Sequence, residues 1–148
     1  MQPDQPVPLL AAMRSLQSAL DSYDRDAAEA MGVGRNDARA LRFLAEKGPA
    51  TPGALMVELG LTSGSVTALI DRLEREGFTK RRPKPDDRRS VVVELSDRGM
   101  RALLDAVSPL NELAGKLSTR LPHERSGAVV KQLDDLTRLV DWAVRTGS

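Results

Sequence analysis

Basic side chains gather in one short segment of the sequence, and small hydroxyl side chains gather just before it. Residues 79–89 hold six cations against two anions, a net charge of +4, so the remainder of a chain whose net charge is +1 carries −3. Upstream, Thr62, Ser63, Ser65 and Thr67 fall within one stretch of six residues. Cations attract phosphate groups, and hydroxyl groups can hydrogen-bond base edges or phosphates. The combination resembles a nucleic-acid footprint, although charge by itself fits a solvated loop equally well.

A helix is predicted to carry the hydroxyl residues. Apolar side chains recur at i, i+3, i+4 and i+7 and predict one buried face; they are Val66, Leu69, Ile70 and Leu73. Thr62 or Ser63 can cap the start of the helix, and Gly77 closes it. The opposite face is slim and polar, so the first turn of this helix could enter the major groove of DNA.

A short helix and a β-hairpin are predicted on either side of this helix. Thr51 followed by Pro52 is a capping residue with proline at the first helical position, and this helix ends at Gly60. After the helix at 62–76, two strands flank a predicted loop from Pro83 to Arg89. The order is that of a winged helix-turn-helix, in which the hairpin is the wing.

Long amphipathic helices are predicted at both ends of the sequence. Apolar residues step by three and four from Leu9 to Ala30 and from Val129 to Ala143. Between these segments, Asn36 is expected to cap one helix and Ser96 another, which Pro109 is expected to kink. The fold class is therefore mainly α with a small β-hairpin wing.

The apolar seams at the two ends exceed what a small winged domain needs for its own core. We expect residues 1–34 and 97–148 to form a helical dimerisation region and residues 35–96 to form the DNA-binding lobe. An intrachain helical subdomain is the alternative. A two-fold dimer would set its recognition helices about 34 Å apart, which suits a pseudo-palindromic operator.

The predicted DNA contacts lie on the helix at 62–76 and on the hairpin. They are Thr62, Ser63, Ser65, Thr67, Arg72, Arg75, Arg82, Lys84, Arg88 and Arg89. For the serines, the alternative is that they only cap the helix. For Arg75, it is an intrahelical pair with a neighbouring acid. An arginine on a projecting ribbon suits the narrow, electronegative minor groove.

Three stretches of the sequence resemble the MarR family of winged helix-turn-helix transcription regulators. They read TPGALMVELG, LTSGSVTALIDRLEREGF and DDRRSVVVELSDRG, and the likeness is strongest from Asn36 to about Leu104. The resemblance implies that Arg89 enters the minor groove and that Asp87 braces the wing. It also implies a recognition helix from Thr62 to Glu76 and a homodimer formed by the first, fifth and sixth helices.

Some members of that family resemble sensors of aromatic acids, which they bind between the dimer helices and the DNA-binding lobe. A small aromatic or other organic effector is therefore expected by analogy. The candidates to line its pocket are Arg14, Tyr23, Arg39 and Arg42. Each of the four would alternatively be a surface or packing residue.

Composition excludes several other kinds of site. The chain has no cysteine and one histidine, His123, so thiol redox sensing and thiolate metal sites are excluded, and we expect no metal and no cofactor. The sequence offers no pair of nucleophile and base and no phosphate-binding loop that would indicate an enzyme. No segment resembles a membrane span or an export signal, so a cytoplasmic protein is expected.

The sequence thus predicts a sequence-specific DNA-binding transcriptional regulator that acts as a homodimer on double-stranded DNA. Repression is the expected mode, with release by a small-molecule effector. The alternative is a winged-helix module that docks an acidic protein through its basic hairpin. A salt titration separates the two, because each phosphate neutralised on B-DNA contributes about −0.9 to the slope of log affinity against log salt.

Overall fold

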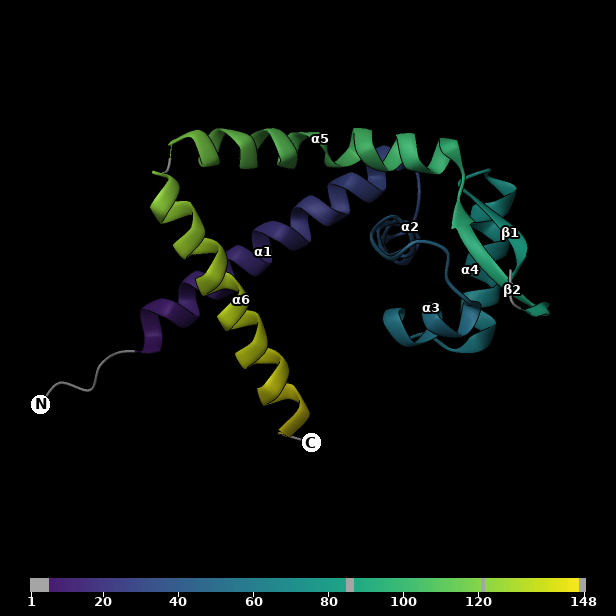
Figure 1. The fold of residues 1–148 in the computed structure, drawn as a ribbon, viewed down its shortest axis with the longest axis horizontal. Helices are drawn as coiled ribbons and strands as arrows, with labels where there is room; N and C mark the ends of the chain where they lie inside the picture. Colours follow the sequence, from purple (N-terminus) through teal and green to yellow (C-terminus); the bar gives the residue numbers. More distant parts are fainter. Residues whose placement is uncertain (1–5, 85–86, 121, 147–148) are drawn as a thin grey trace, which may run out of the picture. The chain divides into compact units, whose positions relative to one another are not determined.

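The computed structural model describes residues 6–84, 87–120 and 122–146, and these ranges contain six helices and a two-stranded hairpin (Figure 1). In chain order the elements are α1 (Pro6–Met31), α2 (Arg35–Lys47), α3 (Pro52–Leu59), α4 (Ser63–Arg75), β1 (Thr79–Lys84), β2 (Asp87–Leu95), α5 (Asp97–Arg120) and α6 (His123–Thr146). The predicted fold class, mainly α with a β-hairpin, is confirmed.

The chain divides into two compact units inside α5. One unit ends at Val107 and the other begins at Ser108. Helix α5 continues through Pro109, so this proline does not end the helix. Whether it kinks α5 stays a prediction.

The core of the first unit is built from α2, α3, α4 and the base of the hairpin. The apolar stripe predicted on α4, Val66, Leu69, Ile70 and Leu73, is 1–2% exposed. It packs with further buried side chains: Ala40, Leu41, Leu44, Leu55, Leu59, Phe78 and Val93. Burial of this stripe leaves the opposite face of α4 exposed.

Helices α3 and α4 meet at the sharp angle of a helix-turn-helix. Thr51 caps α3, its Oγ1 accepting the N–H of Ala54 at 3.2 Å. At the other end Gly60 has φ of 64°, a left-handed conformation that favours glycine. Helix α4 follows at a bend of 111°. Both predicted ends of α3 are confirmed.

The predicted cap of α2 is wrong. The N-cap is Gly34, whose N–H donates to Oδ2 of Asp37 at 3.2 Å, and Asn36 already lies within the helix. Asp37 is buried and also accepts a hydrogen bond from Arg72 of α4, so a tertiary contact selects it as the acceptor at this helix start.

The hairpin is longer than predicted. Its strands run antiparallel, with Arg81 opposite Val93, and the pairing continues through Pro83 opposite Val91 to Lys84 opposite Asp87. Much of the predicted loop is therefore strand, with an irregularity between Pro83 and Lys84. Proline is tolerated here because each strand of a two-stranded sheet is an edge strand.

Candidate nucleic-acid interface

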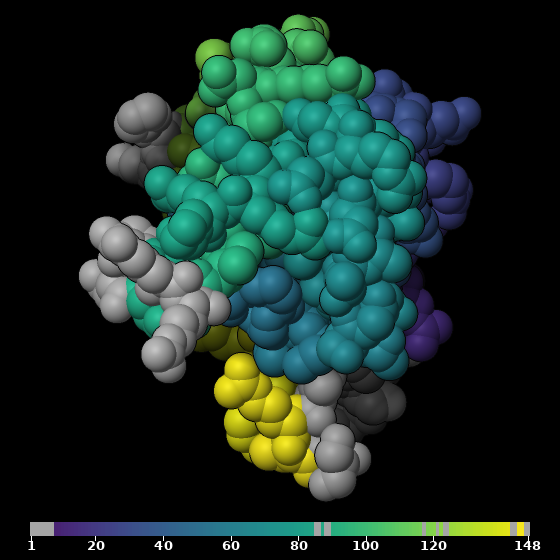
Figure 2. Space-filling view, turned by 90° about the vertical axis from the view of Figure 1, so that its right-hand side faces the viewer, coloured from purple at the N-terminus to yellow at the C-terminus, as the bar shows by residue number. Residues whose placement is uncertain are grey.

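The first turn of α4 carries the four predicted hydroxyl residues, all of them on the surface. Thr62 is the N-cap: its Oγ1 accepts the N–H of Ser65 at 3.3 Å and lies 2.9 Å from the Ser65 hydroxyl. Thr67 donates its hydroxyl to the carbonyl of Ser63 at 2.9 Å. Capping and exposure thus coexist, because all four residues remain exposed while Thr62 and Thr67 make these hydrogen bonds. Figure 2 shows this part of the chain in teal on one continuous face.

Two arginines one turn apart on α4 have different surroundings. Arg72 donates from Nε and Nη2 to the carboxylate of Asp37 on α2, at 2.9 and 2.5 Å. This hydrogen bonding raises the pKa of Arg72. Arg75 is exposed and makes no ion pair among the described residues, so the intrahelical pair considered for it is not formed. Arg72 braces α4 against α2, whereas Arg75 is available to an external partner.

Three cations at the base of the hairpin are paired with acids. Glu94 on β2 binds Lys80 at 3.4 Å and Arg82 at 2.7 Å. Arg81 on the alternate face binds Asp71 and Glu74 of α4. The local charge of +4 is therefore partly balanced by acids outside residues 79–89. Sequence reasoning missed these partners, because only the strand register and the packing of β1 on α4 bring them together.

The far half of the hairpin holds the remaining predicted contacts. Lys84 is exposed and makes no ion pair in the described ranges. The side chains of Arg88 and Arg89 lie outside the described residues, although their backbone belongs to β2. Asp87 accepts a hydrogen bond from the Ser90 hydroxyl at 2.6 Å.

The four predicted effector residues do not gather around one cavity. Arg14 is exposed on α1, and Arg39 donates to the Glu58 carbonyl at the end of α3 at 3.3 Å. Arg42 pairs with Asp24 at 2.7 Å, a hydrogen bond that raises the pKa of Arg42. The Tyr23 hydroxyl donates to the Ala106 carbonyl at 3.0 Å. Arg39 and Arg42 thus hold helices together.

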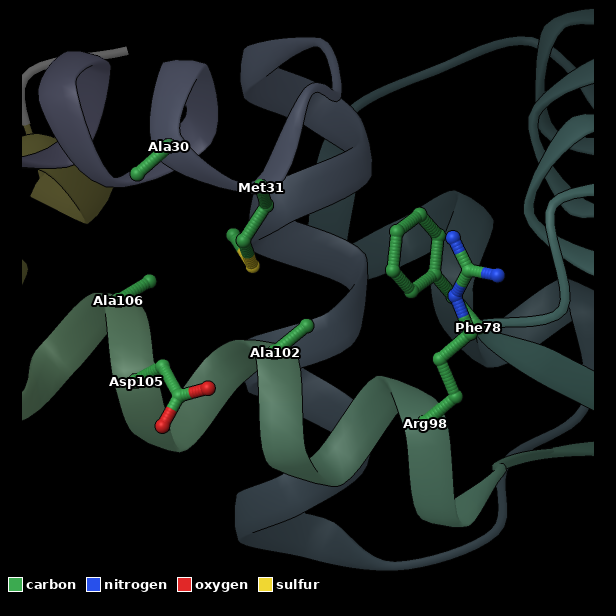
Figure 3. Close-up of a pocket in the computed structure, with 7 residues that line it drawn as sticks. All are labelled: Ala30, Met31, Phe78, Arg98, Ala102, Asp105 and Ala106. Atoms are coloured by element: carbon green, nitrogen blue, oxygen red, sulfur yellow. The ribbon is translucent and has the colours of Figure 1, made fainter.

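A pocket of about 340 Å³ lies within the first unit (Figure 3). Its lining residues are Ala30, Met31, Phe78, Arg98, Ala102, Asp105 and Ala106. Figure 3 shows the end of α1 facing α5, with Arg98 beside the Phe78 ring, and the guanidinium carbon lies 5.1 Å from the ring centroid. None of the four predicted effector residues lines this pocket, although Tyr23 binds the carbonyl of one residue that does.

The hairpin is fastened to the start of α5 beside this pocket. Ser96 donates its hydroxyl to the Gly77 carbonyl at 2.6 Å and accepts the N–H of Gly99 at 3.0 Å, which confirms it as the cap of α5. A Cβ on Gly99 would lie 2.1 Å from the Phe78 carbonyl oxygen. The close approach of α5 to the hairpin base therefore requires glycine at this position.

Neither a metal site nor a membrane-spanning helix is found in the same ranges. Among the described side chains, no three of His, Asp and Glu are grouped so that they could hold a metal ion. Within those ranges no single helix is long and apolar enough to cross a membrane; α3 and α4 reach that length and composition only when counted together across their bend.

Known proteins resemble this chain in sequence. A sequence model described as the MarR family matches residues 35–91. The HTH-type transcriptional regulator YcgE of Bacillus subtilis, itself uncharacterized, is 38% identical over 99 residues, which cover 67% of this chain and 64% of that regulator, slightly under two thirds of its length. Another from the same organism, the uncharacterized YkoM, is 34% identical over 119 residues, covering 79% of this chain and 76% of the relative.

The solved structures give the same fold. A MarR family protein from Bacillus stearothermophilus aligns with a TM-score of 0.76 over 91% of this chain and 94% of that chain. The two sequences are 21% identical in this alignment. At that identity the likeness establishes the fold.

Proposed function

This chain belongs to the MarR family of winged helix-turn-helix transcription regulators, and we propose that it represses transcription as a homodimer bound to a pseudo-palindromic operator. The family resemblance predicted from the sequence is confirmed, and the role of a DNA-binding regulator is part of this proposal. One observation carries the proposal further: α4 presents an exposed polar first turn in the same compact unit as a cation-bearing hairpin. A duplex could therefore meet both elements at once.

We assign base contacts to the first turn of α4 and phosphate or minor-groove contacts to the hairpin. Thr62, Ser63, Ser65 and Thr67 are exposed on α4, and hydroxyl groups can serve either base edges or phosphates. The proposed cationic contacts are Arg75, Lys84, Arg88 and Arg89. The hydrogen bond from Ser90 to Asp87 supports the bracing role of that aspartate. Arg72 and Arg82 are secondary candidates, because carboxylates already hold them.

The homodimer is supported by apolar side chains that the chain leaves exposed. On α1 they include Leu9, Leu16 and Leu20, and on α6 they include Leu133 and Trp142. Burial of such surface by a second copy would contribute roughly 25 cal/mol per Å² of apolar area. We propose that residues 1–34 and 97–148 form the dimerisation region and residues 35–96 form the DNA-binding lobe.

Repression follows from occupancy, because a dimer on its operator excludes other proteins from that duplex. We propose that a small organic effector releases it by binding the pocket beside the hairpin base. Arg98 could attract an anionic group there, and Phe78 offers an aromatic ring. Such a ligand shifts the protein only by its difference in affinity for two conformers. Since the regulator must reach DNA, the proposal places it in the cytoplasm.

Fluorescence anisotropy with labelled duplexes tests the operator. The DNA immediately upstream of the protein's own gene is one probe, and a random duplex of equal length is the control. We expect tighter binding to the upstream DNA and a linear fall of log affinity with log salt. Equal affinity for both duplexes would overturn specific regulation. Failure to bind either duplex would favour the protein-docking alternative.

Thermal-shift measurements with benzoate and related aromatic acids test the effector. A ligand that binds the native state raises Tm in a saturable way. We expect Arg98→Ala to remove the shift caused by an anionic ligand. A shift that survives this substitution would place the ligand elsewhere.

A further inference from the structure

Arg81 on β1 is joined to α4 by three hydrogen bonds. Its backbone N–H donates to Oε1 of Glu74 at 3.1 Å, and its guanidinium donates to Oε2 of the same side chain and to Oδ1 of Asp71. The two acids are three residues apart on α4 and so share one face of the helix. The main chain and the side chain of Arg81 thus both bind one face of α4. These three hydrogen bonds form a tie between the hairpin and α4.

The strand register explains why this residue makes the tie. Val93, opposite Arg81, exchanges both of its backbone hydrogen bonds with Ala50, at 2.9 and 2.8 Å. In an antiparallel pair, two residues that lie directly opposite each other point their N–H groups either both toward or both away from the partner strand. Since the N–H of Val93 points away from β1, that of Arg81 points away from β2. The N–H of Arg81 therefore points to the outer edge of β1, where Glu74 accepts it.

The neighbouring cations do not make such a tie. Lys80 and Arg82 project from the other face of the strand and pair with Glu94 inside the hairpin. Among the described hairpin residues, Arg81 is thus the cation that connects the hairpin to the recognition helix.

The tie does not attract DNA by charge. Arg81 faces two carboxylates, so the three side chains together carry −1 and would repel a phosphate. The hydrogen bonds, first that to Asp71 and then that to Glu74, raise the pKa of Arg81, and the guanidinium stays charged and paired. An acidic cluster beside a DNA-reading helix therefore needs a role other than phosphate binding.

We infer that Arg81 is a positioning residue that holds the hairpin at a fixed separation from α4, so that one duplex meets the first turn of α4 and the hairpin cations together. This inference rests on the proposed DNA-binding function. Pre-organisation of this kind increases affinity by reducing the entropy lost when the hairpin is ordered on DNA.

A double substitution that removes the two acids separates the positioning role from a simple effect of charge, because the two predict opposite changes in operator affinity. Asp71→Asn with Glu74→Gln makes the DNA-facing unit more positive, so charge by itself predicts tighter operator binding. Loss of the tie predicts weaker binding, by about five- to thirtyfold. The matched control is Glu46→Gln with Glu58→Gln, which removes the same charge from two exposed acids of α2 and α3 in the same unit that make no ion pair among the described residues. We expect this control to bind as well as the wild type or slightly better.

Substitution of Arg81 supplies an independent readout. Arg81→Ala should weaken operator binding and leave the slope of log affinity against log salt unchanged. Removal of a phosphate-binding cation would instead reduce the magnitude of that slope by about 0.9. Arg81→Lys keeps the charge but loses the planar guanidinium that can bind two carboxylates at once. We therefore expect its operator affinity to lie between those of Arg81→Ala and the wild type. Circular dichroism confirms that each variant is folded before its affinity is compared. If the double substitution unfolds the protein, the two Arg81 variants decide.

The outcomes separate this inference from the proposed function. If the wild type prefers its upstream DNA and the acid double variant binds that DNA equally or more tightly, the positioning role is overturned and the regulator stands. A smaller magnitude of the salt slope in Arg81→Ala would likewise overturn the positioning role. If the wild type shows no preference for the upstream DNA, the proposed function itself fails.

Discussion

Helices α4 and α6 carry apolar stripes of the same helical spacing, yet only the stripe of α4 is covered by the chain. The four residues of the α4 stripe are 1–2% exposed. On α6, Val129, Leu133 and Val140 are 41%, 46% and 46% exposed. The first stripe completes a core with α2, α3 and the hairpin base. The second has no comparable cover within the described residues.

The difference shows what helical periodicity can and cannot predict. Spacing by three and four places apolar side chains on one face and predicts that water will be excluded from that face. It does not identify the molecule that covers the face. For α4 the cover is the same chain, and for α6 we propose that it is a second copy. The two stripes should therefore respond differently to protein concentration.

The largest expected effect is that of a truncation in the covered stripe. Leu69→Ala removes part of a buried side chain and leaves a cavity in the core, and should lower the free energy of unfolding by about 2–5 kcal/mol. Urea denaturation followed by circular dichroism measures it. The decrease should be the same at low and high protein concentration. A decrease below about 1 kcal/mol would contradict the packing described for α4.

A truncation in the exposed stripe should act on association. Leu133→Ala should weaken the dimer by about 1.5–3 kcal/mol, or about tenfold or more in Kd, if a second copy buries this side chain. Analytical ultracentrifugation measures the Kd. Val57→Ala is the control, because Val57 is still more exposed but lies on α3, outside the stripe. An unchanged Kd in Leu133→Ala would count against α6 as the dimer interface.

The same contrast explains which parts of the fold could be predicted from the sequence. Helix ends depend on a few neighbouring residues, and the predicted caps Thr51 and Ser96 and the terminal glycines Gly60 and Gly77 are in place. The cap at Asn36 is wrong because Asp37 has a tertiary partner that no local pattern reveals. The hairpin exceeds its predicted length because proline is typical of a loop, whereas an edge strand also accepts it, as β1 does at Pro83.

Ion-pair partners were the least predictable part of the candidate site. Asp37 and Arg72 are 35 positions apart, and their pairing depends on how α2 packs against α4. Glu94 reaches Arg82 through the strand register. Residue type therefore located the basic segment but could not say which of its cations are already neutralised.

The charged residues of α4 extend the comparison to smaller effects. Arg72→Ala would leave the buried carboxylate of Asp37 without its cation, and should lower the free energy of unfolding by about 1–3 kcal/mol. We expect the lower half of this range, because the Arg72 side chain is 44% exposed and partly screened by solvent. Thermal denaturation measures the decrease. Arg72→Lys should fall between the variant and the wild type, since lysine cannot bind the carboxylate in bidentate fashion. Equal stability of Arg72→Ala and wild type would argue against the brace.

Arg75 should give the smallest change in stability and a distinct change in DNA binding. Since its exposed side chain makes no ion pair in the described part of the chain, Arg75→Ala should change the free energy of unfolding by less than about 0.5 kcal/mol. If Arg75 neutralises a phosphate, its removal should reduce the magnitude of the slope of log affinity against log salt by about 0.9. Anisotropy titrations at several salt concentrations measure the slope for Arg75→Ala and for the wild type. An unchanged slope in Arg75→Ala would remove Arg75 from the interface and leave the cationic contacts of this lobe to the hairpin.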